Sequence, residues 1–216
     1  NANNTPFKST STNENPNSQD YPKEMGYSLY DNNRSTRIYE LIESYEKIDF
    51  SDFKSIKFDY KYPTPFAFNF VDVNEIMEMN PDDYPDISDL IKEIQSWDRS
   101  TNSDSLGAGI FAMFYYNLGN YIRKPYINRN LSKNLIARML RDVKAYMVKH
   151  FNKTNVKLGE YQKLVRGDKE IPIWGMPDVI TAMTSSRHIG GKRKITHGES
   201  YLSLIHISEP TRQSLI

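Results

Sequence analysis

Apolar residues recur at intervals of three and four positions in several segments, and this spacing predicts one buried face of a helix. We expect helices around residues 38–45, 86–97, 105–123 and 135–147, and a further helix that starts at Ser51. Asn33 or Ser35 is the expected N-cap of the first helix. The positions expected to face inward are Ile38, Leu41, Ile42, Tyr45, Ile56, Ile87, Leu90, Ile91, Ile94, Leu106, Ile110, Phe111, Phe114, Leu118, Ile122, Leu135, Ile136, Met139, Leu140, Val143 and Met147.

The segments between these helices predict loops and short strands. Residues 8–24 are polar and contain two prolines, so we expect a long surface loop. Residues 59–73 are aromatic and contain two prolines, which favours extended or irregular backbone. Nearer the C-terminus we expect a short strand near 171–174, a helical turn near 178–183 and a basic hairpin or loop around 190–194. Together these elements predict an α+β fold.

Composition narrows the function classes. The chain has 216 residues, 28 Lys and Arg and 27 Asp and Glu, so its net charge is +1. This balance gives no general reason to expect nucleic acid or an anionic membrane as a partner. The absence of cysteine excludes disulfides, thiolate zinc sites and cysteine nucleophiles. No apolar run approaches the roughly 20 residues that span a bilayer, so no membrane span is expected.

The N-terminal quartet Asn1-Ala2-Asn3-Asn4 is the sharpest candidate for chemistry. Such a quartet before a proline is more often a turn than a catalytic element. Amide hydrolysis does need a group of this kind, because the carbonyl oxygen gains negative charge when the carbon becomes tetrahedral. A preorganised asparagine N–H can stabilise that charge.

Other candidates for chemistry are weaker. His150, His188 and His197 do not have metal-ligand spacing, so a structural or exposed role is favoured for each. The acidic residues between 82 and 89 lack the pattern of a calcium-binding EF-hand loop and indicate a solvated loop. The glycines and lysines of 190–194 do not form a phosphate-binding loop.

A series of short strings, in order along the chain, resembles a known family. After the asparagine quartet come Tyr27, Arg34–Leu41, Ser51-Asp52-Phe53, Trp97-Asp98 with Asp104-Ser105, Leu158–Asp168, Gly175–Val179 and Gly198–Tyr201. Each string is unspecific alone, but their order across residues 1–201 resembles the penicillin acylase family, which includes acyl-homoserine lactone acylases. The resemblance implies a helix-rich part of an αββα sandwich with an incomplete sheet. Exposed apolar helix faces are therefore expected.

The resemblance also implies a reaction and roles for two residues. Enzymes of this family are N-terminal-nucleophile hydrolases, in which a precursor cleaves itself and the β-chain then begins with a serine that attacks an amide. By resemblance, Asn3 stabilises the oxyanion, and Arg37 orients that asparagine or the substrate. Without the resemblance, Arg37 would be taken as a solvated residue at a helix start.

The chain departs from the family pattern where the nucleophile is concerned. A serine upstream of the quartet is expected, and Asn1 is not such a nucleophile. We therefore expect the N-terminus to be a cut in a β-chain and this chain alone to be inactive. The expected partners are a small acyl-amide substrate and, from the same precursor, the missing N-terminal part of the β-chain and the α-chain. We expect no cofactor; structural calcium occurs in the family, but no residues here can be matched to it.

The last residues form a separate segment in this interpretation. Leu202–Arg212 is similar, residue for residue, to the translation of a sequencing adapter, although an ordinary strand over Tyr201–Ile207 fits the apolar alternation. We therefore expect a partial acylase domain over residues 1–201 and a non-native tail over 202–216.

Two alternatives stay open from the sequence. The chain is either part of a hydrolase of non-peptide C–N amide bonds or a non-catalytic helical interaction module whose acylase-like strings are coincidental. If it is a hydrolase, its substrate is of the penicillin or the acyl-homoserine lactone type. A periplasmic or secreted location is implied by the resemblance only.

Overall fold

The computed structural model describes residues 4–10, 13–68, 70–121, 130–166, 168–181, 187–189 and 192–195. Within these ranges the chain is α+β, as predicted, with most of its regular structure in helices. The helices are α1 (Asn33–Glu43), α2 (Phe50–Lys57), α3 (Ser88–Ser96), α4 (Leu106–Tyr121), α5 (Lys133–Phe151) and α6 (Leu158–Tyr161). Short 3-10 helices are η1 (Ser18–Asp20), η2 (Lys23–Met25), η3 (Asn74–Glu78) and η4 (Pro81–Asp83).

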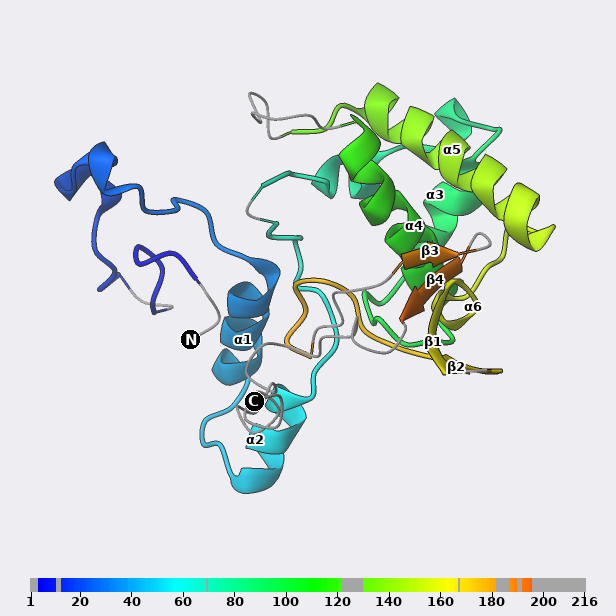
Figure 1. Ribbon diagram of the computed structural model, residues 1–216. Helices are drawn as coiled ribbons and strands as arrows, with labels where there is room; N and C mark the ends of the chain where they lie inside the picture. Colours follow the sequence, from blue (N-terminus) through cyan, green and yellow to red (C-terminus); the bar gives the residue numbers. More distant parts are fainter. Residues whose placement is uncertain are drawn as a thin grey trace, which may run out of the picture.

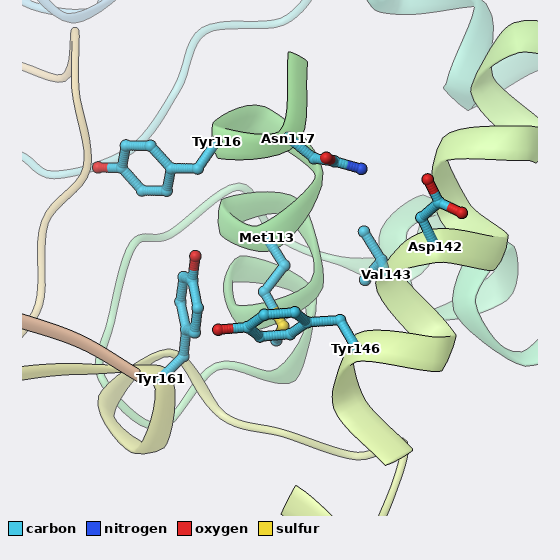
Figure 2. A pocket seen from close by; sticks show the side chains of 7 residues that line it. All are labelled: Met113, Tyr116, Asn117, Asp142, Val143, Tyr146 and Tyr161. Atoms are coloured by element: carbon cyan, nitrogen blue, oxygen red, sulfur yellow. The ribbon is translucent and has the colours of Figure 1, made fainter. Parts of the chain in front are cut away.

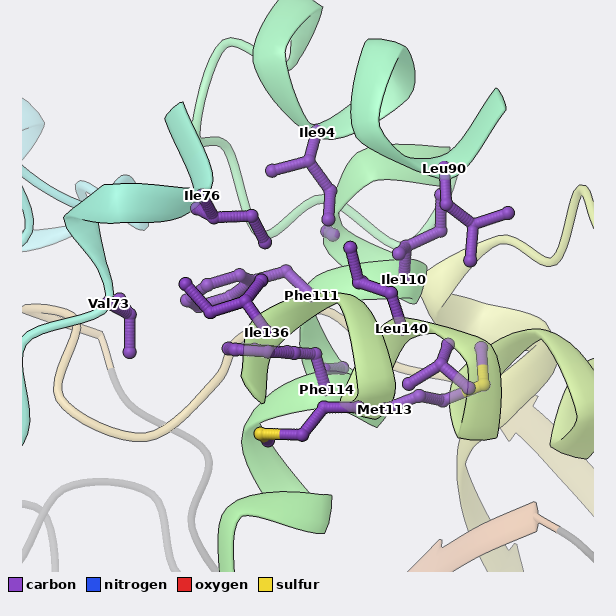
Figure 3. Packing of buried hydrophobic residues seen from close by; sticks show 14 of the residues in the cluster. Val73, Ile76, Leu90, Ile94, Ile110, Phe111, Met113, Phe114, Ile136 and Leu140 are labelled. Atoms are coloured by element: carbon purple, nitrogen blue, oxygen red, sulfur yellow. The ribbon is translucent and has the colours of Figure 1, made fainter. Parts of the chain in front are cut away.

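Helix α4 lies at the centre of the main core. It is apolar on nearly all sides, so it must be surrounded by other elements, and α3, α5 and α6 pack against it. Figure 3 shows Phe111 and Phe114 of α4 meeting Ile94 of α3 and Ile136 of α5, all buried. The helical periodicity predicted that these positions face inward, and the inward positions expected in residues 86–97 are all confirmed as buried. We call residues 62–161 the helical core.

The aromatic segment before η3 belongs to this core. Tyr62, Phe66 and Phe68 are buried, and the ring of Phe66 stacks on Phe111 of α4 at a centroid distance of 4.8 Å. The segment is extended and irregular, as predicted, and the Tyr62 amide donates to the Arg99 carbonyl at 3.1 Å. These rings therefore fill the space on one side of α4 and fix the part of the chain that follows α1 and α2.

One glycine of α4 marks a close approach between backbones. A Cβ placed on Gly109 would lie 2.1 Å from the carbonyl oxygen of Val156. The absent side chain lets the segment before α6 lie directly on the helix, and the Leu158 amide donates to the Ser105 carbonyl at 3.0 Å. This contact places α6 and the strand after it against α4.

A small mixed sheet follows α6. In the described part of the chain it has four strands: β1 (Gln162–Arg166), β2 (Lys169–Pro172), β3 (Arg187–Ile189) and β4 (Lys192–Ile195). The order is β2-β1-β4-β3, with β1 antiparallel to β2 and parallel to β4. Strands β3 and β4 pair antiparallel, so Lys192, Arg193 and Lys194 of the predicted basic hairpin or loop lie in a strand, and residues 190 and 191 lie outside the described residues.

The N-terminal part of the chain packs differently. We call residues 4–58 the limb; Figure 1 shows α1 and α2 set apart from the helices α3 to α5. Residues 13–24 are mostly exposed and contain η1. In α2, Phe50 is 77% exposed and Phe53 is 55% exposed, whereas Ile56 is buried. The expected exposure of apolar helix surface is therefore confirmed in the limb.

Several local predictions were wrong. The N-cap of α1 is Asn32, whose side chain accepts from the Ser35 amide, rather than Asn33 or Ser35. The predicted inward position Ile42 is 43% exposed, because α1 is held by polar contacts and not by an apolar face. The predicted strand at 171–174 starts earlier and ends at Pro172.

Some predicted features cannot be compared with the structure. Ile122 and the tail 202–216 lie outside the described residues. The predicted helical turn at 178–183 is described only as far as residue 181, where the backbone forms turns and bends.

Candidate functional site

The start of α1 is joined to a loop near the other end of the chain. The backbone and side-chain N–H groups of Asn33 both donate to Asp178 Oδ2, at 3.0 and 2.9 Å. Asn33 Oδ1 accepts from the Ala67 amide at 2.7 Å. Asn33 is fully buried, so each of these bonds satisfies a polar group that water does not reach.

Arg34 completes this junction. Its Nε donates to Asp178 Oδ1 at 3.2 Å, so the carboxylate accepts on both oxygens. Burial raises the pKa of Asp178, while the hydrogen bonds from Asn33 and the charge of Arg34 act in the opposite direction. Asp178 has a φ of 65°, which is unusual for a residue other than glycine. The loop therefore adopts a specific conformation that presents this carboxylate to α1.

Arg37 lies one turn further along α1 and binds two carboxylates. Its Nε and one terminal nitrogen donate to the two oxygens of Asp59, at 3.1 and 3.0 Å. The other terminal nitrogen donates to Glu40 at 3.0 Å, and Glu40 also accepts from the Thr64 amide at 2.9 Å. The hydrogen bonding that Arg37 donates to Asp59 is the main cause of the raised pKa of Arg37. Two of its five N–H donors are not used by these bonds.

A groove lies between the loop that contains Asn4 and helix α1. Asn4, Pro6 and Ser9 line one side, Tyr27 lines it as well, and α1 contributes Ser35, Ile38 and Tyr39. The space has a volume of about 580 Å³. Tyr39 connects α1 to the N-terminal loop, because its hydroxyl donates to the Lys8 carbonyl at 2.9 Å. Burial raises the pKa of Tyr39.

Asn4 is the member of the quartet that lines the groove in the described part of the chain. Asn4 is described: its side-chain nitrogen donates to the carbonyls of Thr5 and Lys8, at 3.2 and 3.0 Å. Asn3, the predicted catalytic residue, lies outside the described residues. Arg37, the second predicted residue, does not line the groove; its guanidinium binds Asp59 and Glu40 instead.

A family comparison decides which kind of protein carries this groove. The model of the penicillin amidase family matches residues 2–216. The chain belongs to the penicillin amidase family. A search of curated proteins found no match. The family match supports an amidohydrolase.

Two further observations concern the described part of this penicillin amidase chain. None of its helices is long and apolar enough to cross a membrane. The same ranges hold no group of three or more His, Asp or Glu side chains arranged to bind a metal ion.

Sequence reasoning missed the carboxylates that organise α1. Asp178 and Asp59 are distant in sequence from the arginines they bind, and no periodic pattern marks them. The string Gly175–Val179 was noticed only for its similarity to the family, and it contains Asp178. A covarying pair in related sequences is the kind of signal that detects such contacts.

Proposed function

We propose that this chain supplies the asparagine and arginine of an active site that hydrolyses the C–N amide bond of an acylated small molecule. The observation that carries the proposal is the family match over residues 2–216. In this mechanism an N-terminal serine, outside these 216 residues, attacks the amide carbon, and its own α-amino group accepts the proton. The α-chain and the preceding part of the β-chain are the partners that complete the site.

Asn3 has the role of oxyanion donor in this proposal. Asn4 is the neighbouring candidate, but its side-chain nitrogen already donates to two carbonyls of its own loop. Using Asn4 as a donor to substrate would break a loop contact. The groove beside the quartet, lined by Ile38 and Tyr39 of α1, supports a substrate position at this place.

Arg37 has a positioning role. Asp59 and Glu40 neutralise the charge of Arg37 and fix the plane of its guanidinium. Arg37 therefore does not act mainly by attracting the substrate over a long distance. The two N–H donors that remain can orient an acceptor such as an amide oxygen. Asp59 and Glu40 in turn fix Arg37, so they belong to the same arrangement.

The acyl substrate is of the penicillin or the acyl-homoserine lactone type. Hydrolysis of the first kind serves antibiotic biosynthesis, and hydrolysis of the second kind removes a quorum-sensing signal. We further propose a periplasmic or secreted location, on the basis of the family alone. The family match argues against the alternative that the acylase-like strings belong by coincidence to a non-catalytic helical module.

The proposal is tested in the processed enzyme, with the upstream serine present. Asn3→Ala should lower kcat about 100- to 1,000-fold with a much smaller effect on KM, because the lost N–H acts on the transition state. The assay measures release of the amine product from penicillin G and from acyl-homoserine lactones of several chain lengths.

Asn4→Ala is the matched control, because it removes the same group from the next residue. We expect it to lower kcat less than about tenfold, through loosening of the loop. Equal losses for the two variants, or full activity of Asn3→Ala, would overturn the assignment. The 216-residue chain alone is expected to release no product, and turnover by that chain would contradict the need for an external serine.

A further inference from the structure

A second cavity lies in the helical core, between α4, α5 and α6. Its volume is about 340 Å³, enough for a small organic molecule. Figure 2 shows the side chains around it: Met113, Tyr116, Asn117, Asp142, Tyr146 and Tyr161. None of these residues has a part in the proposed hydrolysis, and the groove beside the asparagine quartet is lined by different residues.

The walls of this cavity are mainly tyrosine rings. Tyr146 and Tyr161 lie at 87° to each other with ring centroids 6.2 Å apart, so they form two sides of a corner. Tyr161 is only 2% exposed, and Tyr146 also packs on His150 at 4.5 Å, so neighbouring rings restrict both. Figure 2 shows Tyr116 on the opposite side of the space. The faces of such rings carry partial negative charge and attract cations.

The polar end of the cavity is negative. Asn117 and the Asp142 carboxylate lie together there, on facing sides of α4 and α5 (Figure 2). The Tyr121 hydroxyl donates to Asp142, and this bond raises the pKa of Tyr121. Neither lysine nor arginine is among the described residues that line the cavity. An anionic ligand would therefore meet a carboxylate and tyrosine π-faces, and no positive side chain among the described lining residues.

A cation already makes a similar contact just outside the cavity. The guanidinium of Arg138 lies over the Tyr121 ring at 5.3 Å, one helical turn before Asp142. This contact combines the face of a tyrosine ring with the neighbouring Asp142 carboxylate. The cavity lining contains the same two kinds of group. Arg138 itself is not part of the lining.

We propose that this cavity binds a small organic ammonium ion, with its methylated or alkylated nitrogen between the tyrosine rings and its charge toward Asp142. Aromatic enclosure with a carboxylate at one side is the arrangement that recognises quaternary ammonium groups in other proteins. The inference is independent of the amide hydrolysis proposed above, because it uses a separate set of side chains.

The test compares two ligands of the same shape on the full 216-residue chain. Choline carries a trimethylammonium group, and 3,3-dimethylbutan-1-ol carries a neutral tert-butyl group in its place. Titration followed by backbone NMR should show shifts at residues of α4, α5 and α6, with choline binding about tenfold more tightly than the alcohol. Equal binding of the two ligands, or no binding of choline, overturns the proposal.

Variants then locate the bound ion. Tyr146→Leu keeps an apolar side chain but removes one ring face, and it should weaken choline binding about tenfold while affecting the alcohol much less. Asp142→Asn should weaken choline binding about fivefold. Asp104→Asn makes the same charge change at an exposed carboxylate that pairs with Lys157, and it should leave binding unchanged.

Circular dichroism and the Tm of each variant show whether it is folded. Selectivity for choline over the alcohol is the readout that a purely structural role would not move. If folded Tyr146→Leu and Asp142→Asn bind choline as tightly as the original chain, or if Asp104→Asn weakens binding as much as Asp142→Asn, the cavity is not the site.

Discussion

The limb and the helical core contain comparable helices that are stabilised in different ways. In the core, the phenylalanines of α4 are fully buried among other side chains, whereas in the limb Phe50 and Phe53 of α2 are largely exposed. The limb instead connects to the rest of the molecule through carboxylates, at Asp59 and Asp178. The difference shows that an apolar residue in a helix indicates a core only where another element covers it.

The largest expected effect comes from matched phenylalanine truncations in the two regions. Phe111→Ala should lower the free energy of unfolding by about 3–5 kcal/mol, because it leaves a cavity among Phe66, Trp97 and Phe114. Phe50→Ala should change it by less than about 0.5 kcal/mol, since the ring is mostly in water. Urea denaturation of both variants measures the difference, and similar losses would show that the limb has a core of its own.

A smaller effect is expected where the two regions are joined. Asp178→Ala should destabilise the chain by about 2–3 kcal/mol, because it leaves the buried Asn33 side-chain N–H and the Arg34 guanidinium without their acceptor. Amide hydrogen exchange should become faster in α1 and change less in α4.

The control for Asp178→Ala is Asp104→Ala, which breaks an exposed ion pair with Lys157. It should lower the free energy of unfolding by less than about 0.5 kcal/mol. Unchanged exchange in α1 of the Asp178 variant would mean that the junction does not hold the limb in place.

The smallest effect concerns two helix caps. Asp49 caps α2 in a capping box with Asp52, and Ser132 caps α5 by accepting from the Leu135 amide. Each change to alanine should cost about 1 kcal/mol locally. Ser132→Ala should lower the midpoint of global unfolding, whereas Asp49→Ala should mainly increase exchange of α2 amides. Equal shifts of the midpoint would show that limb and core unfold as one unit.

The sequence predicted the helical core well because burial and periodicity agree there. Ile87, Leu90, Ile91 and Ile94 share one helical face, and that face is the buried one. In α1 the same reasoning selected Ile42, which is exposed, since no neighbouring element covers it. Strand β1 was not predicted, because Gln162–Arg166 has no clear apolar alternation, although the turn residues Gly167 and Asp168 follow it.

The roles of Asn3 and Arg37 at the candidate site stay predictions. The family resemblance led to the asparagine quartet and to Arg37, and the structure adds the partners Asp59 and Glu40. Glu40 follows Arg37 by one helical turn, but Asp59 is 22 positions away, and a contact over that separation depends on the whole fold and not on a local pattern. Arg99 is a further example: it is 9% exposed and lies over the Phe66 ring at 4.2 Å, and nothing in its neighbourhood along the chain predicts this.

The bond between Asn33 and Asp178 spans 145 positions of the chain, and this separation sets an order of events during synthesis. At about 5–20 residues per second, a ribosome needs about 7 to 30 s to add the residues between them. During that interval the two N–H groups of Asn33 that later donate to Asp178 can hydrogen-bond only to water. Helix α1 therefore reaches its final position only after the helical core has been made, although α1 precedes that core along the chain.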